Sequence, residues 1–254
     1  MGIDNLRILV GSDGKRGVKT KVEPTLQEAP GVYNDTILAG LDYLLMEMGK
    51  RKMLAVLYLN NSWEWSGGYG YYLEQAGLGQ APRPNEDGYP AFMNFVAKYA
   101  SCEKAHQLFY DYVKFILTRT NRYTKKKYKD DPAIMSWQIG NEPRAFSKEQ
   151  LPAFEKWLGE ASKLIRSLDK NHLISIGSEG KWGCEGELNC WERICADKNV
   201  DYCNIHLWPY NWSWARKDHL QEDLGISCQN TKEYIDEHLE VCGRIRKPLV
   251  MEEF

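Results

Sequence analysis

The residues Ile134-Met135-Ser136-Trp137-Gln138-Ile139-Gly140-Asn141-Glu142-Pro143-Arg144 read as an apolar strand that ends in a polar cap with a glutamate at its tip. The final residues of the chain, Lys247-Pro248-Leu249-Val250-Met251-Glu252-Glu253-Phe254, repeat this arrangement with two glutamates. A pair of carboxylates is what hydrolysis of a glycosidic bond requires. The two segments therefore predict two strands with candidate catalytic glutamates at their carboxyl ends.

Strand and helix patterns alternate along the whole chain, and the strands are apolar on both faces, as in a parallel sheet covered by helices. The loops after the strands are long and rich in Trp, Asn, Glu and Gly, whereas the loops before them are short. This asymmetry predicts an α/β fold of the (β/α)8 TIM-barrel type, with function at the carboxyl ends of the strands. The predicted strands are 5–10, 54–59, 134–140, 173–177, 202–206 and 248–252, and the predicted helices are 34–49, 90–101, 103–122, 148–167 and 231–243.

The strand count predicts an incomplete barrel, because about six of eight strands are found. An open doubly wound sheet is the alternative, but it would usually show a Gly-rich phosphate loop after the first strand. Gly11-Ser12-Asp13-Gly14 matches such a loop poorly, and residues 15–33 read as a polar loop. Without a low-complexity linker or internal repeats, residues 1–254 are expected to form a single domain.

Composition excludes several classes of partner. The 254 residues carry a net charge of −2, with 43% hydrophobic and 27% charged residues, so there is no electrostatic case for binding nucleic acid or a membrane surface. The basic run at 125–129 is followed at once by Asp130 and Asp131, which indicates a solvated helix end. No apolar run reaches transmembrane length, and the chain does not open on a signal peptide.

The seven cysteines do not predict a metal centre. Cys184, Cys190, Cys195 and Cys203 contain no CxxC pair and have no paired His at metal spacing. One or two disulfides and free buried thiols both remain open. We expect neither a metal nor any other cofactor.

Aromatic residues are concentrated in loops that follow strands. Trp63 and Trp65 precede a Gly-rich run, and three further Trp lie in residues 208–214. Exposed aromatic rings with polar neighbours suit stacking against sugar rings. Filling of the core is an equally weighted alternative for any single Trp.

Polar residues at the strand ends would gather on one rim of a barrel. Glu142 and Glu253 can face each other there, and a separation of about 5–5.5 Å would give a retaining double displacement. One glutamate must be protonated and the other ionised, so their surroundings have to separate their pKa values. The polar residues concerned are Arg7, Asn60, Asn61, Asn141, Glu142, Glu179, His206 and Glu253.

These motifs resemble glycoside hydrolase family 5 of clan A, in its β-mannanase branch, over essentially the whole chain. Residues 137–144 resemble the Asn-Glu-Pro motif of the clan, which implies that Glu142 is the general acid/base. Residues 247–254 resemble the motif whose nucleophile directly precedes an aromatic residue, which implies Glu253 rather than Glu252. Strand alternation agrees, because neighbouring residues point to opposite sides and only one can face the barrel axis.

Other segments extend the resemblance: 6–9 with the family's arginine, and 60–68, 177–180 and 206–212 with the β-mannanase branch. It departs at Trp208, since many relatives carry there a Tyr whose hydroxyl bonds the nucleophile, and an indole N–H can donate instead. Arg144 would serve a leaving-group subsite or only pair with a rim carboxylate. The resemblance thus implies that Arg7, Trp63, Asn141, Arg144, His206 and Trp208 bind substrate.

The resemblance also implies truncation at both ends, because full members have eight strands while Arg7 matches strand two and Glu253 matches strand seven. The expected activity is that of an endo-β-1,4-mannanase, a monomer that acts on β-mannan in a secreted or periplasmic setting. One rival is a β-1,4-glucanase of the same family. The other is a non-catalytic mannan-binding protein or an incomplete fragment. Read alone, Asn141-Glu142-Pro143 would be an ordinary helix start.

Overall fold

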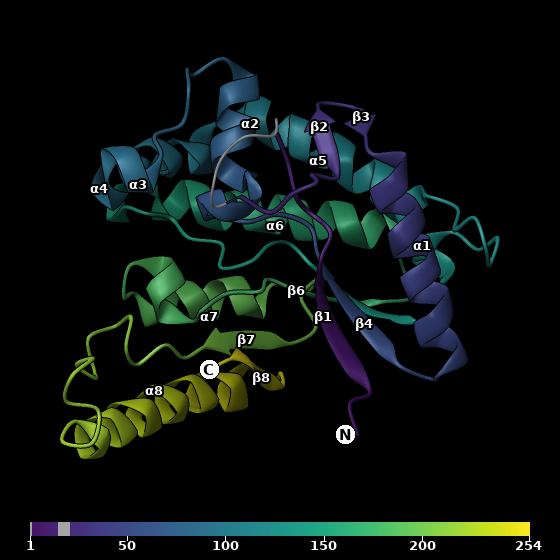
Figure 1. The fold of residues 1–254 in the computed structure, drawn as a ribbon. Coiled ribbons are helices and arrows are strands. Elements are labelled where there is room, and N and C mark those ends of the chain that lie inside the picture. Colours follow the sequence, from purple (N-terminus) through teal and green to yellow (C-terminus); the bar gives the residue numbers. More distant parts are fainter. Residues whose placement is uncertain (1, 15–20) are drawn as a thin grey trace.

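Two parallel sheets form the inner wall of the molecule in the computed structural model, which describes residues 2–14 and 21–254 (Figure 1). The larger sheet has the order β1-β4-β5-β6, and the smaller one pairs β7 with β8. These strands are β1 (Asn5–Leu9), β4 (Leu54–Tyr58), β5 (Ile134–Gln138), β6 (Leu173–Ser175), β7 (Cys203–His206) and β8 (Leu249–Glu253).

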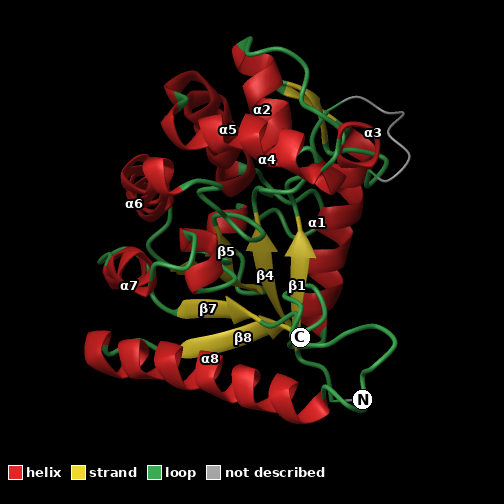
Figure 2. Ribbon diagram, turned by 90° about the vertical axis from the view of Figure 1, so that its left-hand side faces the viewer, coloured by secondary structure: helices red, strands yellow, loops and turns green. Residues whose placement is uncertain are grey.

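Helices cover the outside of this wall, as Figure 2 shows for α1, α6, α7 and α8. Helix α1 begins after Asn34, whose side-chain oxygen accepts hydrogen bonds from the backbone N–H groups of Thr36 and Ile37. The helices are α1 (Asp35–Lys50), α2 (Gly68–Ala76), α3 (Pro84–Asp87), α4 (Tyr89–Val96), α5 (Glu103–Thr118), α6 (Leu151–Leu168), α7 (Leu188–Ala196) and α8 (Leu224–Ile245).

The predicted architecture is confirmed: α/β, parallel, with six strands of a barrel wall among the described residues. Several elements differ from the expectation. Helices α2 and α3 lie between the predicted strand 54–59 and the predicted helix 90–101, where only a loop was predicted. A short hairpin, β2 (Gln27–Ala29) with β3 (Val32–Tyr33), lies in the segment predicted to be a loop, of which 15–20 are outside the described residues. Helix α8 begins at Leu224, earlier than the predicted 231. Its first residues, 224–230, are largely exposed and carry no apolar stripe that would have indicated a helix.

The core is aromatic where α2, α5 and α6 meet. The rings of Tyr69 and Tyr99 stack with centroids 3.9 Å apart, and Trp157 packs edge-on against both. Trp137, Trp157 and Trp191 are fully buried, so for these three the core-filling alternative is correct. All seven cysteines lie in the described part of the chain and are free thiols. None of the described helices is long and apolar enough to cross a membrane.

The two outer strands, β1 and β8, are connected through side chains rather than through a backbone ladder. Nη1 of Arg7 on β1 lies 2.5 Å from Oε1 of Glu253 on β8. This contact brings the carboxyl ends of the two sheets to one place. It is there that the polar residues predicted from the sequence gather.

Candidate active site

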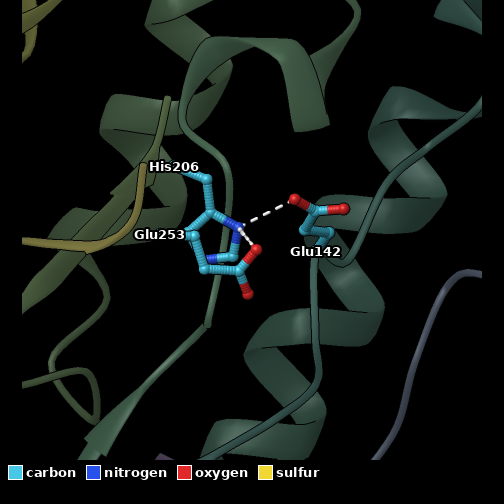
Figure 3. Close-up of side chains that lie close together, drawn as sticks. All are labelled: Glu142, His206 and Glu253. Atoms are coloured by element: carbon cyan, nitrogen blue, oxygen red, sulfur yellow. Dashed lines mark hydrogen bonds and ion pairs between the residues drawn. The ribbon is translucent and has the colours of Figure 1, made fainter. Parts of the chain in front are cut away.

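Glu142, His206 and Glu253 meet at the carboxyl ends of β5, β7 and β8. One nitrogen or oxygen atom from each of the three side chains lies within 4.8 Å of the corresponding atoms of the other two. Figure 3 shows interactions from one nitrogen of the His206 ring, Nδ1, to both carboxylates. The structure therefore brings together the two glutamates that the sequence analysis paired.

The backbone at Glu142 is held in an uncommon conformation. Its φ is +47°, a left-handed geometry that costs a non-glycine residue on the order of 1–3 kcal/mol. The Glu142 N–H donates to the carbonyl of Gly177 (2.9 Å), and its carbonyl accepts from the Ser62 hydroxyl (2.5 Å). Because α6 begins only at Leu151, the reading of this segment as a helix start is wrong.

The Glu142 carboxylate is buried and accepts two hydrogen bonds. Nδ1 of His206 lies 2.8 Å from Oε1, and the indole Nε1 of Trp63 donates to Oε2 at 2.5 Å. Burial acts to raise the pKa of Glu142, but hydrogen bonding and charge from His206, the Trp63 bond and the charge of Arg7 outweigh it and lower the pKa. Glu142 itself therefore does not hold a proton in this arrangement, contrary to the requirement placed on a general acid.

The proton is instead held by the neighbouring imidazole. His206 is fully buried, and burial alone would lower its pKa. The carboxylates of Glu142, Glu252 and Glu253 reverse that effect and raise the pKa to about 9. His206 is thus an imidazolium at neutral pH, with Nδ1 2.8 Å from Oε1 of Glu142. Such a ring has no free lone pair for a metal ion, so the absence of a metal stays our prediction.

Glu253 accepts hydrogen bonds at both carboxylate oxygens. Arg7 donates to Oε1, and the Trp208 indole Nε1 donates to Oε2 at 3.3 Å. The same guanidinium donates from Nη2 to Asn141 Oδ1 at 2.9 Å. Arg7 therefore reaches the glutamate that the motif assigns as nucleophile, and an indole N–H stands where a hydroxyl is usual in the family.

Arg144 pairs with two carboxylates on the rim. Its Nη1 lies 3.1 Å from Oε1 of Glu179, and its Nε lies 3.1 Å from Oε1 of Glu185. Burial, followed by the charge of Glu142, raises the pKa of Glu179 to about 7 despite the opposing charge of Arg144. Arg144 thus pairs with rim carboxylates, and its role at a leaving-group subsite stays a prediction.

Two further residues of the site, Gln138 and Glu252, were not predicted from the sequence to be site residues. Gln138 accepts from Nε of Arg7 at 2.8 Å and donates to Glu252 Oε1 at 2.5 Å. The alternation argument is wrong, since Glu252 and Glu253 both contact Arg7 and His206. The cause is a register shift in the β7–β8 ladder between Ile205 and His206. A polar Gln138 inside a buried strand was the available signal.

Comparison with known proteins agrees with this geometry. The sequence profile described as glycoside hydrolase family 5 β-mannosidase-like matches residues 1–254. Mannan endo-1,4-β-mannosidase 4 of Solanum lycopersicum is 31% identical over 238 residues, which are 90% of this chain and 56% of that protein. Mannan endo-1,4-β-mannosidase 1 of Arabidopsis thaliana is 31% identical over 244 residues, covering 90% and 54%. The chain thus spans about half the length of these curated relatives.

Solved structures give the same result. The family 5 mannosidase of Rhizomucor miehei superposes with a TM-score of 0.87 at 33% identity, over 100% of this chain and 60% of that one. The endo-1,4-β-D-mannanase of Thermotoga petrophila superposes with a TM-score of 0.76 at 23% identity, over 99% and 70%, and so supports the fold alone. The chain belongs to glycoside hydrolase family 5, in its β-mannosidase-like group.

Proposed function

We propose that residues 1–254 are a single catalytic domain, truncated relative to a full barrel, that hydrolyses β-1,4-mannosidic bonds in mannan, galactomannan or glucomannan with retention of configuration. The observation that carries the proposal is the close approach of Glu142 and Glu253 around His206 and Arg7. Relatives named mannan endo-1,4-β-mannosidase support the substrate. A monomer in a secreted or periplasmic setting suits a polymeric substrate.

In the first step, Glu253 attacks the anomeric carbon and forms a covalent mannosyl-enzyme, while Glu142 gives a proton to the leaving glycosidic oxygen. The two donors on Glu253, Arg7 and Trp208, hold the carboxylate as an ionised nucleophile. The proton reaches Glu142 from Nδ1 of His206 at 2.8 Å. In the second step Glu142 takes a proton from water, the hydroxyl adds to the anomeric carbon, and Glu253 is released. The proton then passes from Glu142 back to Nδ1 of His206, which restores the starting state.

Substrate contacts follow from the same arrangement. Asn141, fixed by Nη2 of Arg7, is placed to hold a sugar hydroxyl beside the acid. Trp63 and Trp208 flank the two carboxylates with indole rings suited to stacking on sugar faces. Arg144 lies on the rim, where it would serve a leaving-group subsite.

A second candidate is an exo-acting β-mannosidase. The specific observation in its favour is the higher TM-score with the Rhizomucor miehei mannosidase, 0.87, than with the endo-1,4-β-mannanase from the same organism, 0.75. The mechanism at Glu142 and Glu253 would be the same, and only the extent of the sugar-binding cleft would differ.

The test is hydrolysis of galactomannan, mannohexaose and carboxymethylcellulose by the intact protein, followed by viscosity and product sizes. A rapid fall in galactomannan viscosity with mixed oligosaccharides supports the endo-mannanase, and release of mannose alone supports the exo-mannosidase. Hydrolysis of carboxymethylcellulose but not of mannan would contradict both and favour the glucanase. Binding of mannan without turnover would favour the non-catalytic alternative.

A further inference from the structure

Glu252 lies next to Glu253 on β8 and has no part in the chemistry described so far. Its side chain is 6% exposed. Oε1 accepts a hydrogen bond from Gln138, while Oε2 lies 3.4 Å from Nε of Arg7 and 3.7 Å from Nε2 of His206. A buried carboxylate that faces two cationic groups is costly to desolvate, so its position requires a compensating interaction.

Two buried atoms in this place lack hydrogen bonds. Within the described part of the chain, neither Oε2 of Glu252 nor Nε2 of His206 has a hydrogen-bond partner. An unsatisfied buried polar group costs about 1–3 kcal/mol, and a charged one costs more. Because the two atoms face each other at 3.7 Å, each is the natural partner of the other. A shortening of less than one ångström would make the bond, as catalytic contacts often tighten once substrate is bound.

The contacts close a ring around the site. Arg7 holds Glu253, His206 holds Glu142, and Glu252 faces both of these cationic groups. Gln138 completes the ring by accepting from Arg7 and donating to Glu252. One carboxylate is therefore connected to both proposed catalytic glutamates through the groups that orient them.

We propose that Glu252 is a positioning residue: its carboxylate, anchored by Gln138, holds the His206 ring and the Arg7 guanidinium in the orientations that serve Glu142 and Glu253. This inference rests on the proposed function. The charged groups facing His206 are Glu142 from the end of β5 and Glu252 and Glu253 from β8. Arg7 and Glu179 complete the local charge. With carboxylates at both ring nitrogens, His206 keeps both N–H protons, and the raised pKa of His206 agrees.

Glu252→Gln tests the proposal, because it keeps the side-chain shape and the acceptor for Gln138 while removing the charge. We expect the pKa of His206, followed by NMR of its ring nitrogens, to fall toward its ordinary value of about 6.5. The alkaline limb of kcat/KM should move with it, and kcat should fall by about 10- to 100-fold, as for other groups that orient a reacting residue. KM should change little.

The controls separate this role from general damage. Glu240→Gln removes the same charge from an exposed position on α8 and should leave the pKa of His206 and kcat as in the wild type. Glu252→Asp keeps the charge but withdraws it from Nε2 of His206 by one methylene, so the pKa of His206 should fall by less than in Glu252→Gln. This variant carries the test if Glu252→Gln does not fold. A His206 titration in the folded Glu252 variants that superimposes on the wild-type curve would overturn the proposal.

The two proposals fail in different ways. If the wild type hydrolyses no mannan or mannoside, the proposed function fails. NMR titration of His206 in the Glu252 variants still measures whether Glu252 raises the pKa of His206. If the wild type is active and the Glu252→Gln titration is unchanged, the role of Glu252 fails and the proposed function stands.

Discussion

Nδ1 of His206 lies 2.8 Å from Oε1 of Glu142, and the imidazole is fully buried. Burial lowers the pKa of a histidine, yet three surrounding carboxylates raise the pKa of His206 to about 9. Hydrogen bonding and charge from His206 in turn outweigh burial and help to lower the pKa of Glu142. In the mechanism we propose, the proton for the glycosidic oxygen is thus held one hydrogen bond away from Glu142, the carboxylate proposed to deliver it. In the proposed mechanism the acid is the His206–Glu142 pair, and its apparent pKa values belong to the two residues together.

Replacing either glutamate by Gln tests their assigned roles. Glu142→Gln and Glu253→Gln should each lower kcat on mannan by orders of magnitude, since one removes the acid and the other removes the nucleophile. On an aryl mannoside with a good leaving group, Glu142→Gln should still form the mannosyl-enzyme and show a burst of phenol, because that step needs no acid. Glu253→Gln should show no burst.

The control for this pair is Glu240→Gln, which removes the same charge on α8. Rates, burst size and melting temperature should match those of the wild type. Near-normal turnover of mannan in either of the two site variants would refute that assignment, and a burst in Glu253→Gln would place the nucleophile elsewhere.

Much of this site was predictable because strand ends share an edge. Glu142 follows an apolar strand, and His206 and Glu253 each end one, so parallel strands bring these positions together. Arg7 lies inside β1 and reaches the same edge through its long side chain. The count of six strands followed from the same alternation. The start of α8 was missed because the residues that extend it are exposed and carry no periodic signal.

What the sequence could not reveal depends on register and on three-dimensional charge. The shift between Ile205 and His206 is set by the pairing of strands more than forty residues apart, and it alone turns Glu252 inward beside Glu253. His206 is protonated because carboxylates from the end of β5 and from β8 lie next to its ring. Neither effect leaves a local pattern along the chain.

The donor to Glu253 can be tested at Trp208. Trp208→Phe removes the indole N–H that lies 3.3 Å from Oε2, and loss of a hydrogen bond to a charged group, worth about 1.5–3 kcal/mol, should lower kcat by about 10- to 100-fold. Trp208→Tyr supplies a hydroxyl donor and should recover much of the rate. Equal kcat values for the Phe and Tyr variants would show that the N–H contributes nothing.

The raised pKa of His206 predicts how stability depends on pH. Between about 6.5 and 9 the unfolded chain loses this proton while the folded protein keeps it, so the free energy of unfolding should fall by about 1.4 kcal/mol per pH unit. The contribution is fully present below about 6.5 and lost by the time the pH passes 9. In His206→Asn this part of the slope should be absent.

Urea unfolding at a series of pH values measures the slope, and the difference between the two curves isolates His206. His219→Asn, at an exposed position, is the matched control and should reproduce the wild-type curve. If the wild type and His206→Asn lose stability in parallel from pH 6.5 to 9, the imidazolium is not held by its carboxylates.

Glu179 predicts a second slope in a more acidic range. Burial raises its pKa from 4.5 to about 7, so between these values the unfolded chain has released the proton while the folded protein still holds it. The free energy of unfolding should therefore fall by about 1.4 kcal/mol per pH unit across that window. Glu179→Gln should flatten the curve there, because an amide has no proton to release.

Glu185→Gln, which removes the other partner of Arg144, is the control and should keep the slope. An unchanged slope in Glu179→Gln would mean that Arg144 holds the carboxylate ionised at pH 5, and Glu179 would then be a simple ion-pair partner on the rim.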